Sequence, residues 1–311
     1  MRSFTAKIND EGVRLNRFCE KVCPSMPQSL LHKAFRNKRI KVNGKKQEEN
    51  YRLQLGDMLE LYINDEFFSC DKKDEFLSAP HENLDIIYED NNVILLFKPF
   101  GLLCHSDNKS ENNLVDMVKS YLFAKNEYLP DNENTFTPSL CNRIDQGTQG
   151  IVIAAKNYHA LSAMNEIIRD NMVQKQYLCV CEKGLADGVY TAYLDRDLNT
   201  KKVSVSSLPA PNSKEIITEF KTLSKKSNFS LIECTLITGR THQIRAHLSF
   251  LGCPILGDTK YGKPFKGLKS QVLSAYKLTF KSLPTNSILS YLSNKTFQLE
   301  HCFPREFFDK L

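Results

Sequence analysis

The spacing of apolar residues in the first 63 residues predicts two short helices followed by a hairpin. Apolar side chains recur at i, i+3, i+4 and i+7 over residues 15–22, which is the pattern of an amphipathic helix, and Pro24 should end it. Pro27 suits the first turn of a second helix. Short strands are then expected at 40–42 and 58–63, with Asn43-Gly44 as a hairpin turn.

The rest of the chain alternates strand and helix patterns after an irregular stretch. Residues 64–80 mix charged residues with a final Ser-Ala-Pro and have no sustained period, so we expect a linker. The patterns predict an α+β protein, with a small helix-helix-hairpin domain at 1–63 and a mixed, largely antiparallel-sheet domain at 81–311. In the second domain, strands are expected at 84–88, 93–97, 151–155, 173–181 and 231–237, and helices near 114–125, 159–170 and 242–251.

Composition favours a globular protein that does not enter the membrane. Hydrophobic residues make up 41% of the chain and charged residues 25%, close to the average for globular domains. The longest apolar runs fall far short of the ~20 residues that span a bilayer, and the N-terminus lacks the apolar segment of a secretion signal, so we expect a cytoplasmic protein. The ten cysteines are scattered along the chain, which favours buried free thiols over disulfides.

The positive charge is concentrated at one end of the chain. Residues 1–63 contain 13 Lys and Arg against 7 Asp and Glu, a net charge of +6 that equals the net charge of the whole protein. The other residues are therefore neutral overall. A basic unit attached to a neutral body indicates a polyanionic partner such as a nucleic acid, although a merely solvated basic surface would have the same composition.

The segment 142–150 is the first candidate for chemistry, because it is polar and ends in a glycine directly before the apolar strand expected at 151–155. Such a loop can hold Asp145 in a fixed place beside a cleft. By itself, however, an Arg-x-Asp sequence more often forms a turn with a local ion pair.

A second polar segment, at 238–247, has the pattern of a strand, a tight turn and a helix. Thr241 should be the N-cap of that helix, and Gly252 should follow its last turn. The apolar residues of the helix form a stripe that packs inward. Surface solvation or a structural hydrogen bond is the simplest explanation for each of the polar residues near its start: Arg240, His242 and Arg245.

Two resemblances to known families favour a functional interpretation of these segments. Residues 12–63 resemble the small RNA-binding domain named after the fourth protein of the small ribosomal subunit. From residue 81 onward the chain resembles the RluA/RluC/RluD family of pseudouridine synthases, in the ordered segments FKPFGLLCH, NRIDQGTQGIVIAAK, KQYLCVCEKG and TGRTHQIRAHLSFLGCPILGDTKYG. The first resemblance implies that the second helix and the following loop face RNA, with these phosphate contacts: Lys33, Arg36, Lys38, Arg39 and Lys41.

The second resemblance implies an isomerase that converts selected uridines of structured RNA to pseudouridine. By position, Asp145 matches the catalytic aspartate, Tyr177 the tyrosine that stacks on the target base and helps to remove a proton, and Arg245 the arginine that pairs with the carboxylate. Arg143 matches the arginine that fills the space left by the flipped nucleotide. Supporting roles follow for Arg240 and His242, and a structural role for the loop of Lys98, Pro99 and Gly101.

The chemistry of this reaction is consistent with those roles. A stacked base is inaccessible, so the uridine must leave the stack. Glycosidases use two carboxylates because water is a reactant, whereas an isomerase consumes no water and one carboxylate can suffice. The sequence differs from the family pattern at Asn142, Ile144, Gln149 and Ser274. None of these differences removes a catalytic group.

Several other functions are disfavoured by the sequence. No cofactor is expected, because the chain has neither a P-loop nor a GxGxxG fingerprint, and no metal, because His242 and His247 have no zinc-protease spacing. The main alternative is a non-catalytic ribosome-associated RNA-binding protein. A hydrolase that uses Asp145 is a third interpretation, which free uracil among the products would support. The resemblance favours large-subunit ribosomal RNA as substrate, with transfer RNA second, and a monomer is the simplest state.

Overall fold

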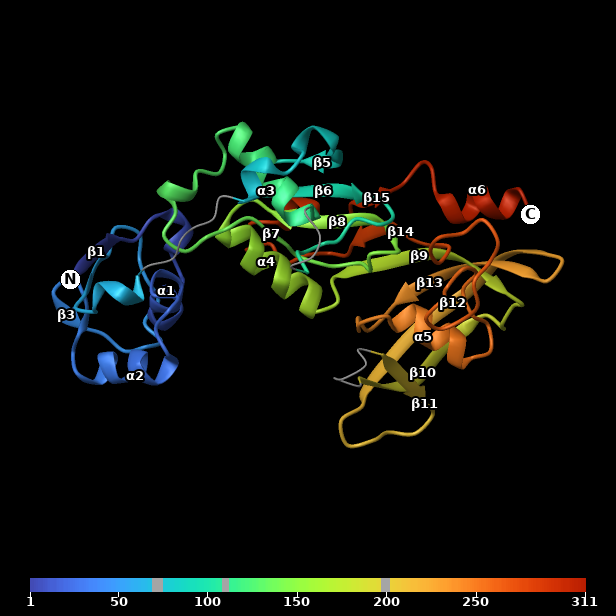
Figure 1. Ribbon diagram of the computed structural model, residues 1–311, viewed down its shortest axis with the longest axis horizontal. Coiled ribbons are helices and arrows are strands. Elements are labelled where there is room, and N and C mark those ends of the chain that lie inside the picture. The colour runs from blue at the N-terminus through green and yellow to red at the C-terminus, as the bar shows by residue number, and fades with distance from the viewer. Residues whose placement is uncertain (69–74, 108–111, 197–201) are drawn as a thin grey trace.

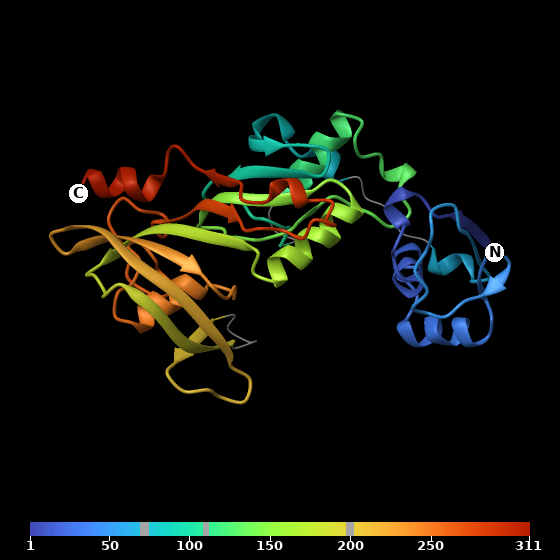
Figure 2. The same cartoon turned by 180° about the vertical axis from the view of Figure 1, so that it is seen from behind.

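The computed structural model describes residues 1–68, 75–107, 112–196 and 202–311. The molecule is elongated, with the N-terminal unit at one end and helix α6 (Phe303–Asp309) at the other (Figure 1). The view from behind in Figure 2 shows that the N-terminal unit is set apart from the large sheet. Within the described ranges, no helix combines the length and the hydrophobicity that crossing a membrane requires.

The N-terminal unit contains the two predicted helices and the predicted hairpin. Helices α1 (Leu15–Val22) and α2 (Gln28–Arg36) share a core with a four-stranded sheet of order β1-β4-β2-β3. Asn43 and Gly44 have φ angles of 53° and 73°, as a two-residue hairpin turn requires. Pro27 is the N-cap residue of α2 and so lies just before its first turn. The strands are β1 (Arg2–Thr5), β2 (Ile40–Val42), β3 (Lys45–Lys46) and β4 (Met58–Leu61).

The segment 64–80 is more structured than the expected linker. It contains two 3-10 helices, η2 (Asp65–Phe67) and η3 (Glu75–Ser78). Phe68 packs into the core of the N-terminal unit, whereas Phe76 packs into a core of the large sheet. Each end of the segment is therefore anchored by an aromatic side chain. Residues 69–74 lie outside the described part of the chain.

Residues from 81 onward are organised around one large sheet. In the described residues this sheet has 11 strands, nine of them in the order β11-β10-β12-β13-β9-β14-β8-β6-β5, with β15 beside β14 and β7 beside β8. Among the described strands only the β14–β8 pair is parallel, so the prediction of a mixed, largely antiparallel sheet is confirmed. The bounds are β5 (Asp85–Glu89), β6 (Val93–Lys98), β7 (Ser139–Leu140), β8 (Gln149–Ala155), β9 (Val173–Glu182), β10 (Gly188–Arg196), β11 (Val203–Ser206), β12 (Lys214–Lys226), β13 (Phe229–Leu236), β14 (Leu273–Phe280) and β15 (Thr296–Gln298).

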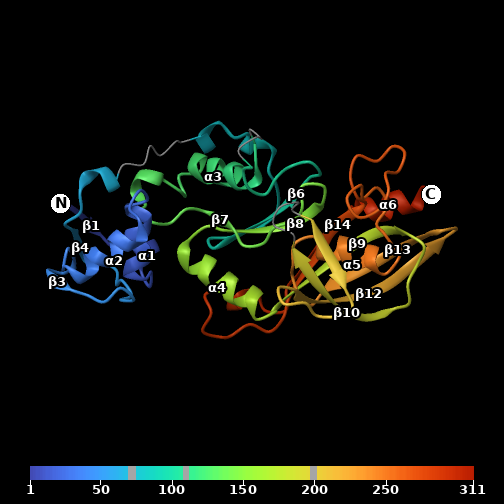
Figure 3. The ribbon, with the colours of Figure 1, turned by 60° about the horizontal axis from the view of Figure 1, so that its bottom comes forward.

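The centre of the sheet is covered on both faces. Helix α3 (Leu114–Ala124) shares a core with alternate residues of β6 and β8, such as Ile94 and Val152. Helix α4 (Tyr158–Arg169) shares a second core with the intervening residues, such as Leu95 and Ile153. Because both faces are buried, these two strands are continuous apolar runs without polar alternation. Figure 3 shows α3 and α4 on either side of the central strands.

The unpredicted strands are β1, β7, β10, β11, β12, β14 and β15. In β12, buried Ile216, Thr218 and Phe220 alternate with more exposed residues, so the period of two was present in the sequence. One face of this strand is exposed and carries lysines and glutamates. The strand therefore has no continuous apolar run, which is the pattern that predicted the buried strands. Single-turn 3-10 helices are η1 (Ile8–Asp10), η4 (His81–Asn83), η5 (Pro130–Asn132) and η6 (Ser290–Leu292).

Candidate active site

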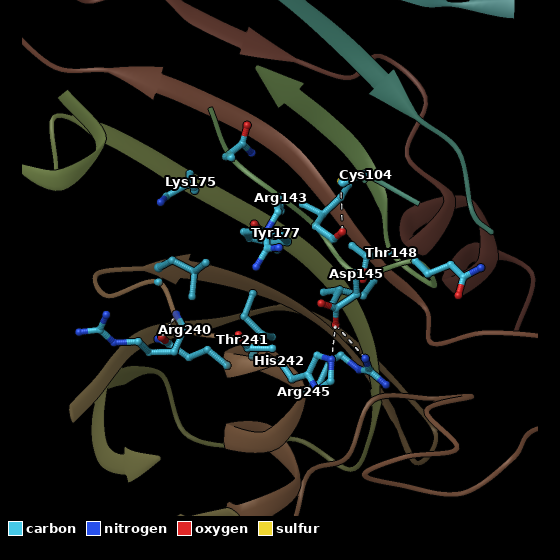
Figure 4. A pocket seen from close by; sticks show the side chains of 18 of the residues that line it. Cys104, Arg143, Asp145, Thr148, Lys175, Tyr177, Arg240, Thr241, His242 and Arg245 are labelled. Carbon is cyan, nitrogen blue, oxygen red and sulfur yellow. Dashed lines mark hydrogen bonds and ion pairs between the residues drawn. The ribbon is translucent and has the colours of Figure 1, made fainter. Parts of the chain in front are cut away.

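A cavity of about 500 Å³ lies where three distant segments of the chain meet. The loop before β8 contributes Asp145, the middle of β9 contributes Tyr177, and the connection from β13 to helix α5 (Gln243–Phe250) contributes His242. Figure 4 shows these side chains around a shared space. The volume is within the ~300–1,000 Å³ usual for ligand pockets, so the cavity can enclose a small polar group.

The Asp145 loop is held close to the sheet. The backbone N–H of Thr148 donates to the carbonyl oxygen of Asp145 at 3.0 Å and closes a turn. At the end of the loop Gly150 has a φ of +130°, and a Cβ there would lie 2.2 Å from the carbonyl oxygen of Ala275 on β14. A side chain would therefore push β8 away from β14, so glycine is required at this point.

Lys98 connects a neighbouring loop to the Asp145 loop. Its side chain is fully buried, and its ammonium group donates to the carbonyl oxygens of Leu102 at 2.7 Å and Gln146 at 3.3 Å. Burial lowers the pKa of this ammonium group to about 8. Gly101 adds a second connection, since its N–H donates to the carbonyl oxygen of Gln146 at 2.9 Å. These contacts give Lys98 and Gly101 the structural role expected from the sequence.

Arg245 lies between two carboxylates. Its Nη1 donates to Asp145 Oδ2 at 2.8 Å, while Nε and Nη2 donate to the two oxygens of Asp258 at 2.7 and 2.8 Å. Burial alone would lower the pKa of the Arg245 guanidinium, but its hydrogen bonds to Asp258 and Asp145 raise that pKa above the ordinary value. Burial would also raise the pKa of Asp258, yet Arg245 outweighs it and lowers that pKa. The pair is therefore a fixed, charged support for Asp145.

His242 and Tyr261 form a second contact beside Asp145. His242 Nδ1 hydrogen bonds with the hydroxyl group of Tyr261 at 2.7 Å, and its Nε2 lies 3.9 Å from Asp145 Oδ2. Burial lowers the pKa of His242, partly opposed by the negative charge of Asp145. The Tyr261 ring also lies 5.3 Å from the guanidinium carbon of Arg245. Tyr261 thus contacts both of the side chains that face Asp145 from α5.

Tyr177 gives the cavity a buried aromatic wall. It projects from β9 and is only 7% exposed. Burial, and next the negative charge of Asp145, raise the pKa of its hydroxyl group, so the phenol stays neutral at physiological pH. A planar base could lie against such a ring while its reacting atoms face Asp145.

The rim of the cavity carries cations. Arg143 and Arg240 are exposed, and neither guanidinium forms a hydrogen bond or ion pair with the described residues. Lys175, two residues before Tyr177 on β9, also lines the cavity. The six residues predicted from sequence are thus all brought to one place, with Asp145, Tyr177, His242 and Arg245 inside and Arg143 and Arg240 at the edge.

The start of α5 corrects one sequence prediction. Thr241 is not the N-cap, because that position belongs to His242, which has a left-handed φ of 55°. No side chain caps α5, and the Oε1 of Gln243 instead accepts from the backbone N–H of Arg240 in the turn before the helix, at 3.0 Å. His242, in this left-handed conformation, lines the cavity.

The five basic residues predicted to contact RNA are not part of the cavity. They lie on α2, the following loop and β2, in the N-terminal unit at the far end of the molecule (Figure 1). Four of them are exposed, whereas Lys41 is half-buried with its ammonium group 5.2 Å from the ring centre of Tyr62. The four exposed residues are Lys33, Arg36, Lys38 and Arg39.

The sequence reasoning missed Asp258 and Tyr261. Both lie in the Gly-Asp-Thr-Lys-Tyr-Gly segment, which carried a resemblance but was given no role. A signal was available, because a buried arginine requires more than one hydrogen-bond acceptor for its five donors. Among the described residues, no group of three or more His, Cys, Asp or Glu side chains could hold a metal ion.

Known proteins of one family are similar to this chain over most of its length. A family model described as RNA pseudouridylate synthase matches residues 92–250. A relative from Mycoplasma capricolum subsp. capricolum, named as an uncharacterized RNA pseudouridine synthase, is 38% identical over 95% of this chain and 96% of its own length. A protein of Rickettsia felis named ribosomal large subunit pseudouridine synthase C is 30% identical over 96% of this chain and 95% of its own.

A solved structure supports the fold. Human RNA Pseudouridylate Synthase Domain Containing 4 has a TM-score of 0.54 and 23% sequence identity, over 72% of this chain and 90% of that one. The matched family and the two relatives indicate that the substrate is RNA. The chain belongs to the RNA pseudouridylate synthase family and is an RNA pseudouridine synthase, an isomerase.

Proposed function

We propose that the protein isomerises specific uridines in structured RNA with Asp145 as its single catalytic carboxylate. One observation carries this proposal: the Asp145 side chain faces a cavity and is held by Arg245 at 2.8 Å, beside buried Tyr177. A carboxylate in that position can act as a nucleophile or as a base on a sugar that enters the cavity.

The reaction needs few groups because it is intramolecular. The bond between ribose C1′ and N1 of uracil breaks, the base rotates, and a bond forms between C1′ and C5. The proton on C5 then leaves and N1 gains one, so the atoms balance without water as a reactant. Tyr177 is suited to stack on the base while it rotates, and Arg245 to orient the Asp145 carboxylate.

Arg143 is suited to assist base flipping. Its guanidinium stands at the mouth of the cavity without a partner among the described residues, so it can move into the RNA helix. A planar cation inserted into the vacated space would offset part of the stacking lost by the uridine. His242, inside the cavity, and Arg240, at its mouth, are assigned supporting roles.

Large-subunit ribosomal RNA is the proposed substrate. The support is the name of relatives such as the Rickettsia felis protein, which describes a ribosomal large subunit pseudouridine synthase. Transfer RNA is the second candidate. The N-terminal unit is proposed to bind RNA phosphates through its basic residues, which places the general affinity for RNA apart from the chemistry.

The test is release of tritium from RNA labelled at C5 of uridine, because that atom leaves only when the base is re-attached there. Large-subunit ribosomal RNA and transfer RNA, both transcribed without modifications, are incubated with the wild type and with Asp145→Asn. We expect release from ribosomal RNA by the wild type alone. Release by both proteins would remove Asp145 from the mechanism, and free uracil among the products would indicate a hydrolase.

A further inference from the structure

Lys175 is a half-buried lysine that lines the cavity, and the proposed mechanism gives it no role. It stands two residues before Tyr177 on β9, so both side chains leave the same face of the strand, and both line the cavity. Its ammonium group forms no hydrogen bond or ion pair with the described residues. Lys175 thus differs from Arg245, whose charge is balanced by two carboxylates.

A half-buried ammonium group without a partner among the described residues is suited to bind an anion. Burial lowers the pKa of the Lys175 ammonium group, and no neighbouring carboxylate opposes that effect. Removing a cation from water without a partner raises the free energy of the empty site. An anion that enters the cavity with the substrate would lower this free energy. In RNA the available anion is a phosphodiester.

The turn at Gly239 is followed by a second cation, Arg240, which lines the same cavity. A Cβ added at Gly239 would lie 3.7 Å from Lys175 Nζ, so the ammonium group rests against this turn. The next residue, Arg240, has its backbone N–H fixed by Gln243 at 3.0 Å, while its side chain is exposed and without a hydrogen bond among the described residues. In Figure 4 both cations are seen to the left of Asp145.

We propose that Lys175 and Arg240 form a phosphate-binding subsite that holds a phosphodiester next to the flipped uridine. The proposal rests on the proposed function, since it assumes that a nucleotide occupies the cavity. Lys175 supplies an ammonium group from the cavity wall, and Arg240 supplies a guanidinium group from the rim. The subsite anchors the backbone of the extruded nucleotide while Asp145 acts on its sugar.

The geometry at Gly239 allows a matched pair of variants. Gly239→Asp places a carboxylate within ion-pairing reach of Lys175, so the protein itself neutralises the subsite. Gly239→Asn adds a side chain of the same shape without the charge. The backbone at Gly239 is not in the left-handed region, and a Cβ there meets only Lys175 Nζ within 4 Å, so both variants fit.

These variants are compared with Lys175→Met and Lys175→Arg on tritium-labelled large-subunit ribosomal RNA, by single-turnover release at several RNA and salt concentrations. We expect Lys175→Met and Gly239→Asp to raise the half-saturating RNA concentration roughly tenfold, with a much smaller change in the saturating rate. Both should also reduce the slope of log affinity against log salt by about 0.7–0.9, the effect of one phosphate no longer being neutralised. Lys175→Arg should retain most of the affinity, and Gly239→Asn should be much less affected than Gly239→Asp.

Lys221→Met on β12 is the control, since it removes an exposed charge that does not line the cavity. An unchanged salt slope in Lys175→Met, or equal effects of Gly239→Asp and Gly239→Asn, would overturn the subsite. These outcomes differ from failure of the proposed function, which would appear as absence of tritium release by the wild type.

Discussion

Arg245 donates two guanidinium N–H groups to Asp258, at 2.7 and 2.8 Å, and only one to Asp145, at 2.8 Å. The Asp258 side chain is 1% exposed and the Asp145 side chain 25%. Asp258 is itself fixed, because its Oδ1 accepts from the backbone N–H groups of Lys260 at 3.0 Å and Tyr261 at 3.1 Å. The buried carboxylate therefore orients the arginine, which leaves the more accessible carboxylate to face the cavity.

Asp145→Asn should abolish turnover and leave RNA affinity within a few-fold of the wild type. The amide keeps the size of the side chain but cannot act as a nucleophile or a strong base. The measurement is tritium release together with filter binding of the same RNA. A parallel loss of binding would show that chemistry and affinity are not divided between the two units as proposed.

Asp258→Asn should slow the single-turnover rate by at least about tenfold while RNA affinity changes little. Without the charge of the Asp258 carboxylate, the Arg245 side chain can turn toward Asp145 and change the orientation of the Asp145 carboxylate. A misplaced catalytic group lowers the rate steeply. Removing the partner altogether in Asp258→Ala leaves a buried guanidinium poorly balanced and should destabilise the fold by about 3–5 kcal/mol. Urea unfolding measures the second effect.

Asp57→Asn is the control for this experiment. Asp57 is 7% exposed and accepts from Asn43 Nδ2, Tyr51 Oη and the backbone N–H of Gln54, all in the N-terminal unit. Its replacement should lower stability without lowering the rate at a temperature where the protein stays folded. Equal rates in Asp258→Asn and the wild type would show that Asp258 contributes stability alone.

Neutralising the exposed basic residues of the N-terminal unit should weaken RNA binding and flatten its salt dependence. Glutamine at Lys33, Arg36, Lys38 and Arg39 should reduce the slope of log affinity against log salt by about 0.7–0.9 for each phosphate that is no longer neutralised. Side-chain variants are preferable to deletion of 1–63, which would uncover Phe68. The same number of charges is removed in the control at Lys214, Lys221, Lys225 and Lys226 of β12. Identical slopes in the two multiple variants would argue against a role of the N-terminal unit in binding RNA.

His247 should make stability depend on pH in weakly acidic solution. It is fully buried, and burial lowers the pKa of its imidazole to about 4. Between that value and the ~6.5 of an unfolded histidine, the unfolded chain binds a proton that the native chain does not. Stability is therefore lost as the pH falls through this window, by up to about 3 kcal/mol near pH 4.

His247→Gln should reduce this pH dependence, which urea unfolding at pH 7.5 and pH 4.5 can measure. The glutamine can keep a hydrogen bond to Thr218 Oγ1, which now lies 3.2 Å from His247 Nδ1. His301→Gln is the control, because that side chain is 90% exposed and should have no such effect. Equal changes in the two variants would mean that burial of His247 is not the cause.

Much of the local structure followed from patterns in the sequence. Helices α1, α2, α3 and α4 and strands β6, β8 and β9 lie within a few residues of their predicted positions, because buried faces leave a regular apolar period. Half-exposed strands such as β12 were missed, since their polar side chains mask the same period. Thr241 was wrongly predicted as a cap because the left-handed turn at His242 is held by Gln243, a contact that no local rule anticipates.

The sequence by itself determined the segments of the site, through the Asp145 loop, the strand of Tyr177 and the helix of Arg245. It also determined that the positive charge is concentrated before residue 64. Only the tertiary structure decided how those groups are paired. Asp145 and Arg245 are 100 residues apart in the chain, and their contact depends on β8 meeting β14 at Gly150 and on α5 packing behind β13 and β9. Asp258, Tyr261 and Lys175 acquire their roles in the same way, because hydrogen bonds, ion pairs and unbalanced charges depend on distances in space that composition and spacing do not contain.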